Sequence, residues 1–268
     1  MIRQGVVIAV ALAVSACMTT SMPPYAPPGI AAELAPSGPL RAAINFGNPI
    51  LASKDPANGE ARGVSVDLSR ELSRRLGVPL ELVTYDAAGK VTDNATTGAW
   101  DIAFVAIDPK RAVDMDYTAP YVLIEGAFVV PQGSPIRAND EVDREGVRVV
   151  AAKGSAYDLY LSRELKNATI VHVARSQEVV AAMVARGVDA GAGVKQQLEA
   201  SARTTPGVRL LDGRFMVIQQ AMATPKGRPA GARYLAAFVE GMKSSGFVDA
   251  ALRRHGIDGA AVAPPAAR

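Results

Sequence analysis

Apolar residues along the chain alternate between two patterns, short continuous runs and repeats at about every fourth position. These patterns predict alternating strands and helices. A short apolar run at 40–46 ends in a Gly-Asn-Pro turn, and the continuous apolar run at 102–107 is typical of a strand buried on both faces. Between them, leucines recur every fourth residue over 68–76 and predict a helix that Gly77 ends. This strand–helix–strand order indicates an α/β fold built on parallel strands.

A second unit of the same kind begins near Val129. Its pattern predicts strands at 147–151 and 170–173, another strand from residue 187, and helices at 157–165 and 178–185. The remaining elements are an apolar strand and two amphipathic helices, predicted at 214–224, 234–243 and 248–252.

The two ends of the chain differ from the body. Residues 1–17 carry one Arg, a short apolar run and small residues, as export signals do, and the run is shorter than the roughly 20 residues that span a bilayer. The end of this segment, Val14-Ser15-Ala16-Cys17, resembles a bacterial lipobox, in which Cys17 is lipidated; the alternative is simple cleavage after Ala16. Proline-rich residues 18–39 are expected to form a tether, and residues 261–268 a disordered tail. The expected location is the periplasm, as a membrane-anchored lipoprotein.

The composition of the chain limits the kinds of partner and site that it can have. Hydrophobic residues make up 49% of the 268, enough for a substantial core, and the net charge is +3 with basic and acidic residues interspersed. No long basic block is present, so no nucleic-acid partner is expected. The chain has two histidines, and its one cysteine, Cys17, lies in the leader. This argues against a structural zinc site and a Cys–His nucleophile. No metal and no cofactor are expected.

Several strings carry a family resemblance. They are Gly63-Val-Ser-Val-Asp-Leu68, Gly98-Ala-Trp-Asp-Ile102, Pro109-Lys-Arg111 followed by Asp116-Tyr-Thr-Ala-Pro-Tyr121, Gly154-Ser-Ala-Tyr157, and Gly246-Phe247. In this order and spacing they resemble the family-3 extracellular solute-binding proteins, the polar-amino-acid-type receptors of ABC transporters.

The resemblance implies a fold of the periplasmic-binding-protein type II kind. One lobe comprises residues 40–128 and 219–260, the other residues 129–218, and two strands cross between them near 128–129 and 219–224. A small ligand is bound in the cleft and buried by hinge closure. The implied partner is an ABC permease, and the protein is expected to be a monomer and not an enzyme.

The resemblance also implies which residues form the centre of the ligand-binding site. In the family, the Arg at the position of Arg111 binds the ligand carboxylate, for which a planar guanidinium is well suited. Ser155 opens a helix, where a hydroxyl and the N–H of Ala156 can bind an anion. The alternatives are a surface Arg111 paired with Asp108 or Asp114, and a Ser155 that only caps its helix.

Other candidates surround this centre. Asn45 and Phe46 end the first strand and either line the cleft or serve as a turn cap and core residue. The segment 105–109 lacks the family's hydroxyl, and 191–195 lacks the Asp that binds the ligand ammonium, which puts an α-amino acid in question and leaves an organic acid open. Glu125 or Asp108 could replace that acid; Lys195, and more weakly Lys90 and Gln220, are further candidates. Asp67 and Trp100 are expected to be structural.

Glu125 lies within an apolar run, so it needs a partner, which could be a structural Arg or Lys instead of a ligand. If Lys195 faces the cleft, the ligand bears two acidic groups.

Two further functions remain open. One is an enzyme resembling cyclohexadienyl dehydratases, with Glu125 as a general acid of raised pKa. The other is a lipoprotein sensor that uses the cleft to regulate a partner.

Overall fold

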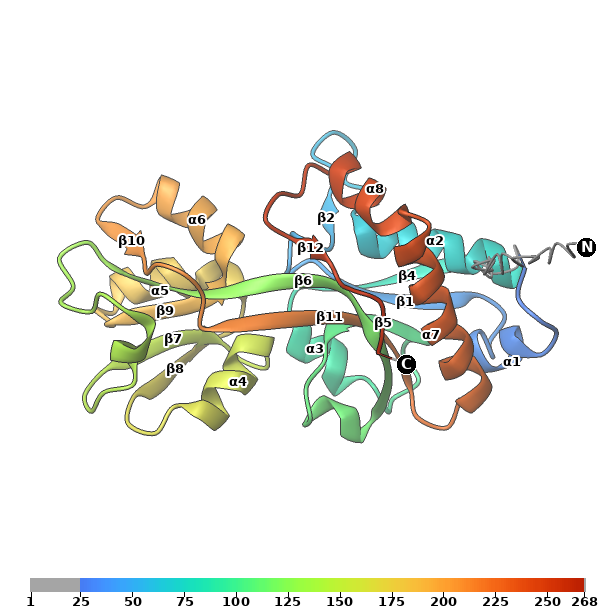
Figure 1. Ribbon diagram of the computed structural model, residues 1–268, viewed down its shortest axis with the longest axis horizontal. Coiled ribbons are helices and arrows are strands. Elements are labelled where there is room, and N and C mark those ends of the chain that lie inside the picture. Colours follow the sequence, from blue (N-terminus) through green and yellow to red (C-terminus); the bar gives the residue numbers. More distant parts are fainter. Residues whose placement is uncertain (1–24, 268) are drawn as a thin grey trace, which may run out of the picture.

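The computed structural model describes residues 25–267, which form two lobes joined by long strands (Figure 1). Within these residues, ten strands form one sheet, whose main path has the order β4-β1-β5-β11-β6-β9-β7-β8. The strands are β1 (Leu40–Asn45), β4 (Leu80–Tyr85), β5 (Ile102–Ala106), β6 (Met115–Pro131), β7 (Arg148–Ala152), β8 (Thr169–Val173), β9 (Ala190–Val194), β10 (Val208–Leu210), β11 (Met216–Pro225) and β12 (Ala261–Val262).

Helices flank this sheet. They are α1 (Ile30–Leu34), α2 (Val64–Leu76), α3 (Ala88–Asp93), α4 (Ala156–Glu164), α5 (Val179–Ala185), α6 (Lys195–Thr204), α7 (Pro229–Ser244) and α8 (Phe247–Arg254). Three 3-10 turns, η1 (Arg111–Val113), η2 (Asn139–Val142) and η3 (Ser176–Glu178), and a small hairpin, β2 (Ser53–Lys54) with β3 (Ala61–Arg62), complete the described elements.

In each lobe, the central strands are parallel. In lobe 1, β1 pairs with β4 on one side and β5 on the other; in lobe 2, β7 pairs in the same way with β8 and β9. The predicted leucine face of α2 is buried, and Gly77 ends this helix with a φ of 68°, in the left-handed region that glycine enters without strain. The carboxyl ends of β1, β5, β7 and β9 are followed by the segments that build the site.

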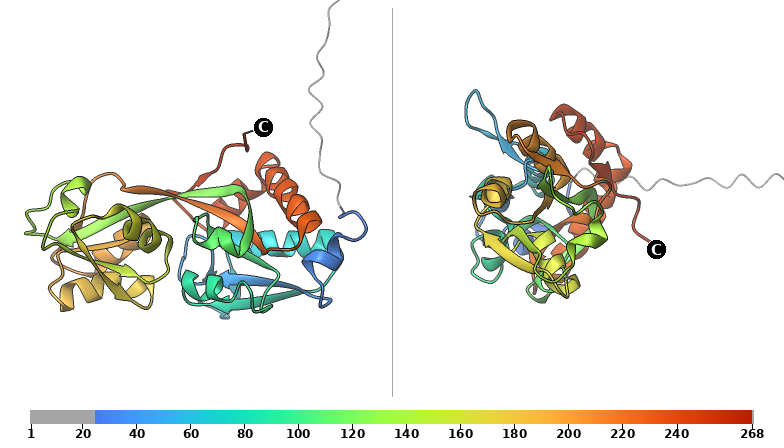
Figure 2. Two further views of the ribbon diagram at one scale, coloured as in Figure 1. Left: turned by 90° about the horizontal axis from the view of Figure 1, so that it is seen from below. Right: turned by 90° about the vertical axis from the view of Figure 1, so that its left-hand side faces the viewer.

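Strands β6 and β11 connect the lobes. They run antiparallel to each other, and β6 continues from its pairing with β11 to a pairing with β9 beyond Gly126. Seen from below in Figure 2, these two strands bridge the gap between the two groups of elements. The predicted fold class, a type II-like α/β fold with two crossing strands, is confirmed.

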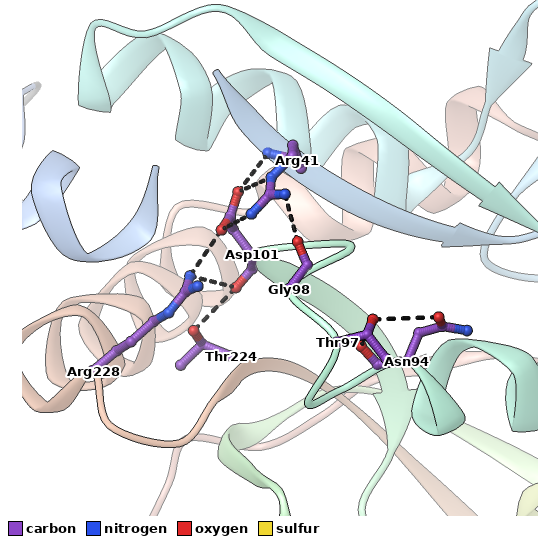
Figure 3. Close-up of polar contacts among 7 residues, drawn as sticks. All are labelled: Arg41, Asn94, Thr97, Gly98, Asp101, Thr224 and Arg228. Carbon is purple, nitrogen blue, oxygen red and sulfur yellow. Dashed lines mark hydrogen bonds and ion pairs between the residues drawn. The ribbon is translucent and has the colours of Figure 1, made fainter. Parts of the chain in front are cut away.

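A buried carboxylate ties together one end of lobe 1 (Figure 3). Asp101 is fully buried, with Oδ1 2.9 Å from Nη2 of Arg41 on β1 and 3.0 Å from Nη1 of Arg228, which precedes α7. Thr224 donates to the backbone oxygen of Asp101, and Arg41 also donates to the backbone oxygen of Gly98. The Gly98–Asp101 string is therefore structural here.

The two residues that were predicted to be structural, Trp100 and Asp67, also have internal partners. Trp100 is fully buried and donates from Nε1 to the backbone oxygen of Val91 at 3.0 Å. Asp67 on α2 accepts from Arg254 and contacts His255, both at 2.8 Å, and so links α2 to the end of α8.

Two predicted boundaries differ from the structure. The tether was predicted to extend to residue 39, but α1 lies within this range and packs on α7. Leu34 of α1 is fully buried there, and a Cβ at Gly231 of α7 would lie 2.8 Å from its Cδ2. The predicted disordered tail instead contains β12, which pairs with β6, and Ala263 donates to the backbone oxygen of Tyr121. The predicted export signal, the lipobox at Cys17 and the first residues of the tether lie outside the described residues.

Candidate functional site

A cavity of about 40 Å³ lies between the lobes where the parallel strands end. It is lined by side chains from both lobes and from the crossing strand β11, namely Asn45, Asn48, Leu51, Ala88, Phe104, Val105, Ala106, Arg111, Ser155, Ala156, Tyr157, Ser176, Val194, Ile218 and Gln220, together with Gly47. Four of the predicted residues, Asn45, Arg111, Ser155 and Ala156, are thus brought together in one cavity.

Arg111 is the only charged residue that lines this cavity among the described residues, and it is only 4% exposed. Its Nη1 donates to the backbone oxygen of Ala106 in lobe 1 at 2.9 Å, and its Nη2 to that of Gly154 in lobe 2 at 2.8 Å. The third donor, Nε, is buried and has no hydrogen-bond partner within residues 25–267. Burial lowers the pKa of Arg111, as expected for a cation removed from water.

The surface alternative for Arg111 is wrong. The side chain is buried, and within residues 25–267 it forms no salt bridge with Asp108 or Asp114. Its two hydrogen-bond partners are neutral carbonyls, which compensate the charge of the guanidinium only in part. Burying a cation without an anion is costly. An anion beside the guanidinium would compensate the rest of this charge.

Ser155 is the N-cap of α4, and its Oγ accepts from the backbone N–H of Asp158 at 3.1 Å. This cap leaves the N–H groups of the first helical residues, beginning with Ala156, directed away from the helix, as at any helix N-terminus. Gly154 precedes it with a φ of 72°, and a Cβ there would lie 2.9 Å from the Cα of Gly89 in lobe 1. Glycine at 154 thus permits close contact between the lobes.

Polar side chains surround these two residues. The Oδ1 of Asn45 accepts from the N–H of Gly47 at 2.8 Å, and that of Asn48 accepts from the N–H of Ile50 at 3.2 Å. Gln220 lies at an irregularity in the register of β11 and is 5% exposed. Bulges of this kind commonly redirect a side chain beside a site.

Phe46 does not line the cavity, so its predicted role as an aromatic wall is wrong. It is half-buried against the core, and Lys54 Nζ lies 5.5 Å from its ring centroid. Phe46 follows the end of β1 at Asn45 and lies in the turn that begins there. Phe104 on β5 and Tyr157 on α4 supply the aromatic surface instead.

Asp108 also lies outside the cavity. It is 3% exposed, but its Oδ2 accepts from Nη1 of Arg163 on α4 at 2.8 Å, and its Oδ1 accepts from the N–H of Lys110. Both oxygens are thus used by the protein, and the predicted role of Asp108 as a ligand acid is not supported by this geometry.

Glu125 and Lys195 pair with each other away from the cavity, at 3.0 Å, and Arg214 Nη1 lies 2.7 Å from the other Glu125 oxygen. Hydrogen bonds from Lys195 and then Arg214 lower the pKa of Glu125. This is opposite to the raised pKa that a general acid requires, so the predicted cleft roles of Glu125 and Lys195 are wrong. The structural-partner alternative for Glu125 holds.

Of the two weaker candidates, one reaches the cavity. Gln220 lines it, whereas Lys90 pairs with Asp86 at 2.7 Å and faces a separate groove. The sequence-based prediction omitted Asn48, Ser176, Phe104, Tyr157 and Val194. Ser176, Tyr157 and Val194 lie at or next to a helix start or strand end, which could have suggested them. Phe104 lies in the middle of β5 and Asn48 in the loop after β1, where no local signal marks them.

Within residues 25–267, no helix combines the length and apolar character needed to cross a membrane. In the same part of the chain, no group of three or more His, Cys, Asp or Glu residues is arranged to hold a metal ion.

The fold and the interlobe cavity define a two-lobed binding protein. Residues 40–257 match the family of bacterial extracellular solute-binding proteins, family 3, and the chain belongs to this family. This confirms the sequence-based assignment and agrees with a binding protein that is not an enzyme. Among curated proteins, no sequence matches the chain.

Solved structures give the same fold at low sequence identity. The solute receptor for L-cysteine of Neisseria gonorrhoeae is 22% identical with a TM-score of 0.72, covering 84% of this chain and 92% of that chain. A putative ABC-transporter binding component from Wolinella succinogenes, complexed with lysine, is 22% identical with a TM-score of 0.69. The match covers 81% of this chain and 95% of that chain. An ancestral amino-acid-binding protein, a precursor of cyclohexadienyl dehydratase, is 22% identical with a TM-score of 0.69, covering 83% and 96%.

Proposed function

We propose that this protein is an extracytoplasmic receptor that captures a small carboxylate-bearing solute between its lobes and delivers it to an ABC importer. The observation that carries the proposal is the buried Arg111, which lines the cavity and whose Nε has no hydrogen-bond partner among the described residues. A carboxylate can accept two parallel, charge-assisted hydrogen bonds from a guanidinium and neutralise its charge.

Lobe 2 supplies the second half of the proposed site. The Ser155 cap and the N–H of Ala156 lie at the start of α4, a nine-residue helix whose N-terminus carries a partial positive charge. Arg111 already bonds to Gly154 of this same loop. A carboxylate held between the two groups would favour the closed arrangement of the lobes, as in hinge closure around a ligand.

Transport is the use we infer for this capture. Family membership supports a solute-binding role, and the Wolinella succinogenes neighbour is a binding component of an ABC transporter. The N-terminal sequence supports export and a lipid on Cys17, which would hold a monomeric receptor beside its permease. Mass spectrometry of the cellular protein tests the anchor: acyl chains on Cys17 are expected, and a free thiol at a mature N-terminal Cys17 contradicts it.

A thermal-shift screen tests the capture of a carboxylate. Each small carboxylate is compared with its own amide, which keeps the shape but removes the charge. A ligand that binds only the native state at 100 times its Kd adds about 2.7 kcal/mol to stability, so the unfolding midpoint should rise with the acid and not with the amide. Equal shifts for acids and amides contradict the proposal.

A further inference from the structure

The cavity around Arg111 offers hydrogen-bond donors but no carboxylate. No Asp or Glu within residues 25–267 lines it. The side-chain oxygens of Asn45 and Asn48 already accept from backbone N–H groups, which leaves their NH2 groups as donors. The Nε of Arg111 is a further donor, without a partner in the described part of the chain. These groups suit a ligand rich in acceptor oxygens.

Backbone acceptors beside the guanidinium are also engaged. The oxygen of Ala106 accepts from Arg111 and, at 3.3 Å, from the hydroxyl of Tyr117. The oxygen of Gly154 accepts from Arg111 as well. An ammonium group has three donors and no acceptor. The Ala106 oxygen already accepts two hydrogen bonds, and the Gly154 oxygen keeps one lone pair, so these two carbonyls could accept only part of the hydrogen bonds of an ammonium group.

The nearby acids are used within the protein. Asp108 pairs with Arg163, as described above. Asp158 accepts from the N–H of Gly154 at 2.8 Å through one oxygen, and its other oxygen lies 2.7 Å from Nε2 of His172. Neither carboxylate lines the cavity or has an oxygen left without a partner.

Val194 presents an apolar side chain to the cavity at the end of β9, and it is 5% exposed. An ammonium bound close to Val194 would lose water without gaining a charge partner, which is costly. Gln220, which pairs with Ala106 of β5, supplies a side-chain amide that can both donate and accept, and a hydroxyl or carbonyl oxygen matches it.

The size of the cavity limits the ligand further. A water molecule needs roughly 10–15 Å³ of such space, so the cavity of about 40 Å³ corresponds to about three waters. The cavity thus suits a small ligand.

We propose that the ligand is a short-chain organic acid without an ammonium group, of the 2-hydroxy or 2-oxo acid class. Its carboxylate binds Arg111 and the start of α4, and its second oxygen binds the amides of Asn45, Asn48 or Gln220. The inference rests on the proposed function of the same cavity as a carboxylate site.

Matched pairs of acids test this inference by isothermal titration calorimetry on the purified protein. Glycolate is compared with glycine, L-lactate with L-alanine, and 2-oxobutanoate with 2-aminobutanoate. The unpaired, buried ammonium should make each amino acid bind about tenfold or more weakly than its partner. Amino acids that bind as tightly as their partners overturn the inference while leaving the carboxylate receptor intact. If no member of either series binds, the carboxylate receptor itself is overturned, and the inference with it.

A variant of the cavity wall gives a second readout. Val194→Asp places a carboxylate in the cavity and should shift the affinity ratio toward the amino acids by about tenfold, because a charged partner then compensates the ammonium. Val194→Asn is the matched control, since it has the same shape without the charge. Thermal unfolding identifies the variants that are folded. A folded Val194→Asp protein with an unchanged ratio contradicts the inference, as does an equal shift in Val194→Asn.

Discussion

Asp108 and Arg163 form an ion pair that joins the two lobes. Asp108 follows β5 in lobe 1, and its Oδ2 lies 2.8 Å from Nη1 of Arg163 on α4 in lobe 2. The Asp108 side chain is 4% exposed and that of Arg163 is 43% exposed. Separating the lobes would break the pair, so its energy contributes only to the closed arrangement.

Arg163→Ala should therefore weaken ligand binding, although Arg163 does not line the cavity. The buried Asp108 loses its partner in the closed state, and the dissociation rate of a bound carboxylate should rise by about fivefold or more. Stopped-flow measurement of dissociation checks this. Arg253→Ala removes the exposed pair with Asp249 on α8 and is the matched control. Equal dissociation rates in the two variants would contradict a role for the pair in closure.

Asp101→Asn should destabilise lobe 1 strongly. Asp101 is fully buried between Arg41 and Arg228, and removing the charge leaves two cations with a neutral partner. Breaking a buried pair in this way costs roughly 3–5 kcal/mol, which urea unfolding would measure. Asp249→Asn breaks an exposed pair and should change stability by less than about 1 kcal/mol. Similar small losses in both variants would contradict the structural role of Asp101.

Deleting residues 261–268 should lower stability, because β12 and Ala263 bond to β6. Loss of a few net hydrogen bonds at about 0.5–1.5 kcal/mol each should reduce the free energy of unfolding by roughly 1–3 kcal/mol. Deleting only residue 268 controls for shortening the chain. Identical unfolding curves for the two truncated proteins would mean that the C-terminal strand adds nothing to the fold.

Glu71 should contribute to the acid sensitivity of the protein. Hydrogen bonding to Arg74, with further help from Arg75, lowers the pKa of Glu71 from its ordinary 4.5 to about 2. Because the folded-state pKa is the lower one, the stabilisation is complete above pH 4.5 and is lost as the pH falls toward 2. Urea unfolding at pH 6 and pH 3 checks this: the gap between wild type and Glu71→Gln should narrow at the lower pH. A constant gap would contradict it.

Local patterns predicted much of the fold. The strands of both lobes follow from short apolar runs, and α2 from its leucine spacing, because these elements are buried along one face or both. Strand β12 has only two residues and no periodicity of its own, and α1 follows a proline-rich stretch. Both depend on contacts with distant residues, which the local sequence does not contain.

The centre of the site was predicted from the family resemblance of two short motifs, those that contain Arg111 and Ser155. The parallel topology brings these two residues into one cavity. The pairing of Glu125 with Arg214 spans 89 residues, so it could not be inferred from the apolar run around Glu125. Which of Asn45 and Phe46 faces the cavity depends on the turn that begins after Asn45, whose geometry the local pattern did not predict.

The central claim is that Arg111 binds the carboxylate of the ligand. Calorimetry with the tightest-binding acid from the screen, on wild type and Arg111→Ala, tests it most directly, with Arg253→Ala as a surface control and thermal unfolding as a check on folding. The account predicts a loss of at least ~2 kcal/mol of binding free energy in Arg111→Ala alone. Unchanged affinity in a folded Arg111→Ala protein would contradict it.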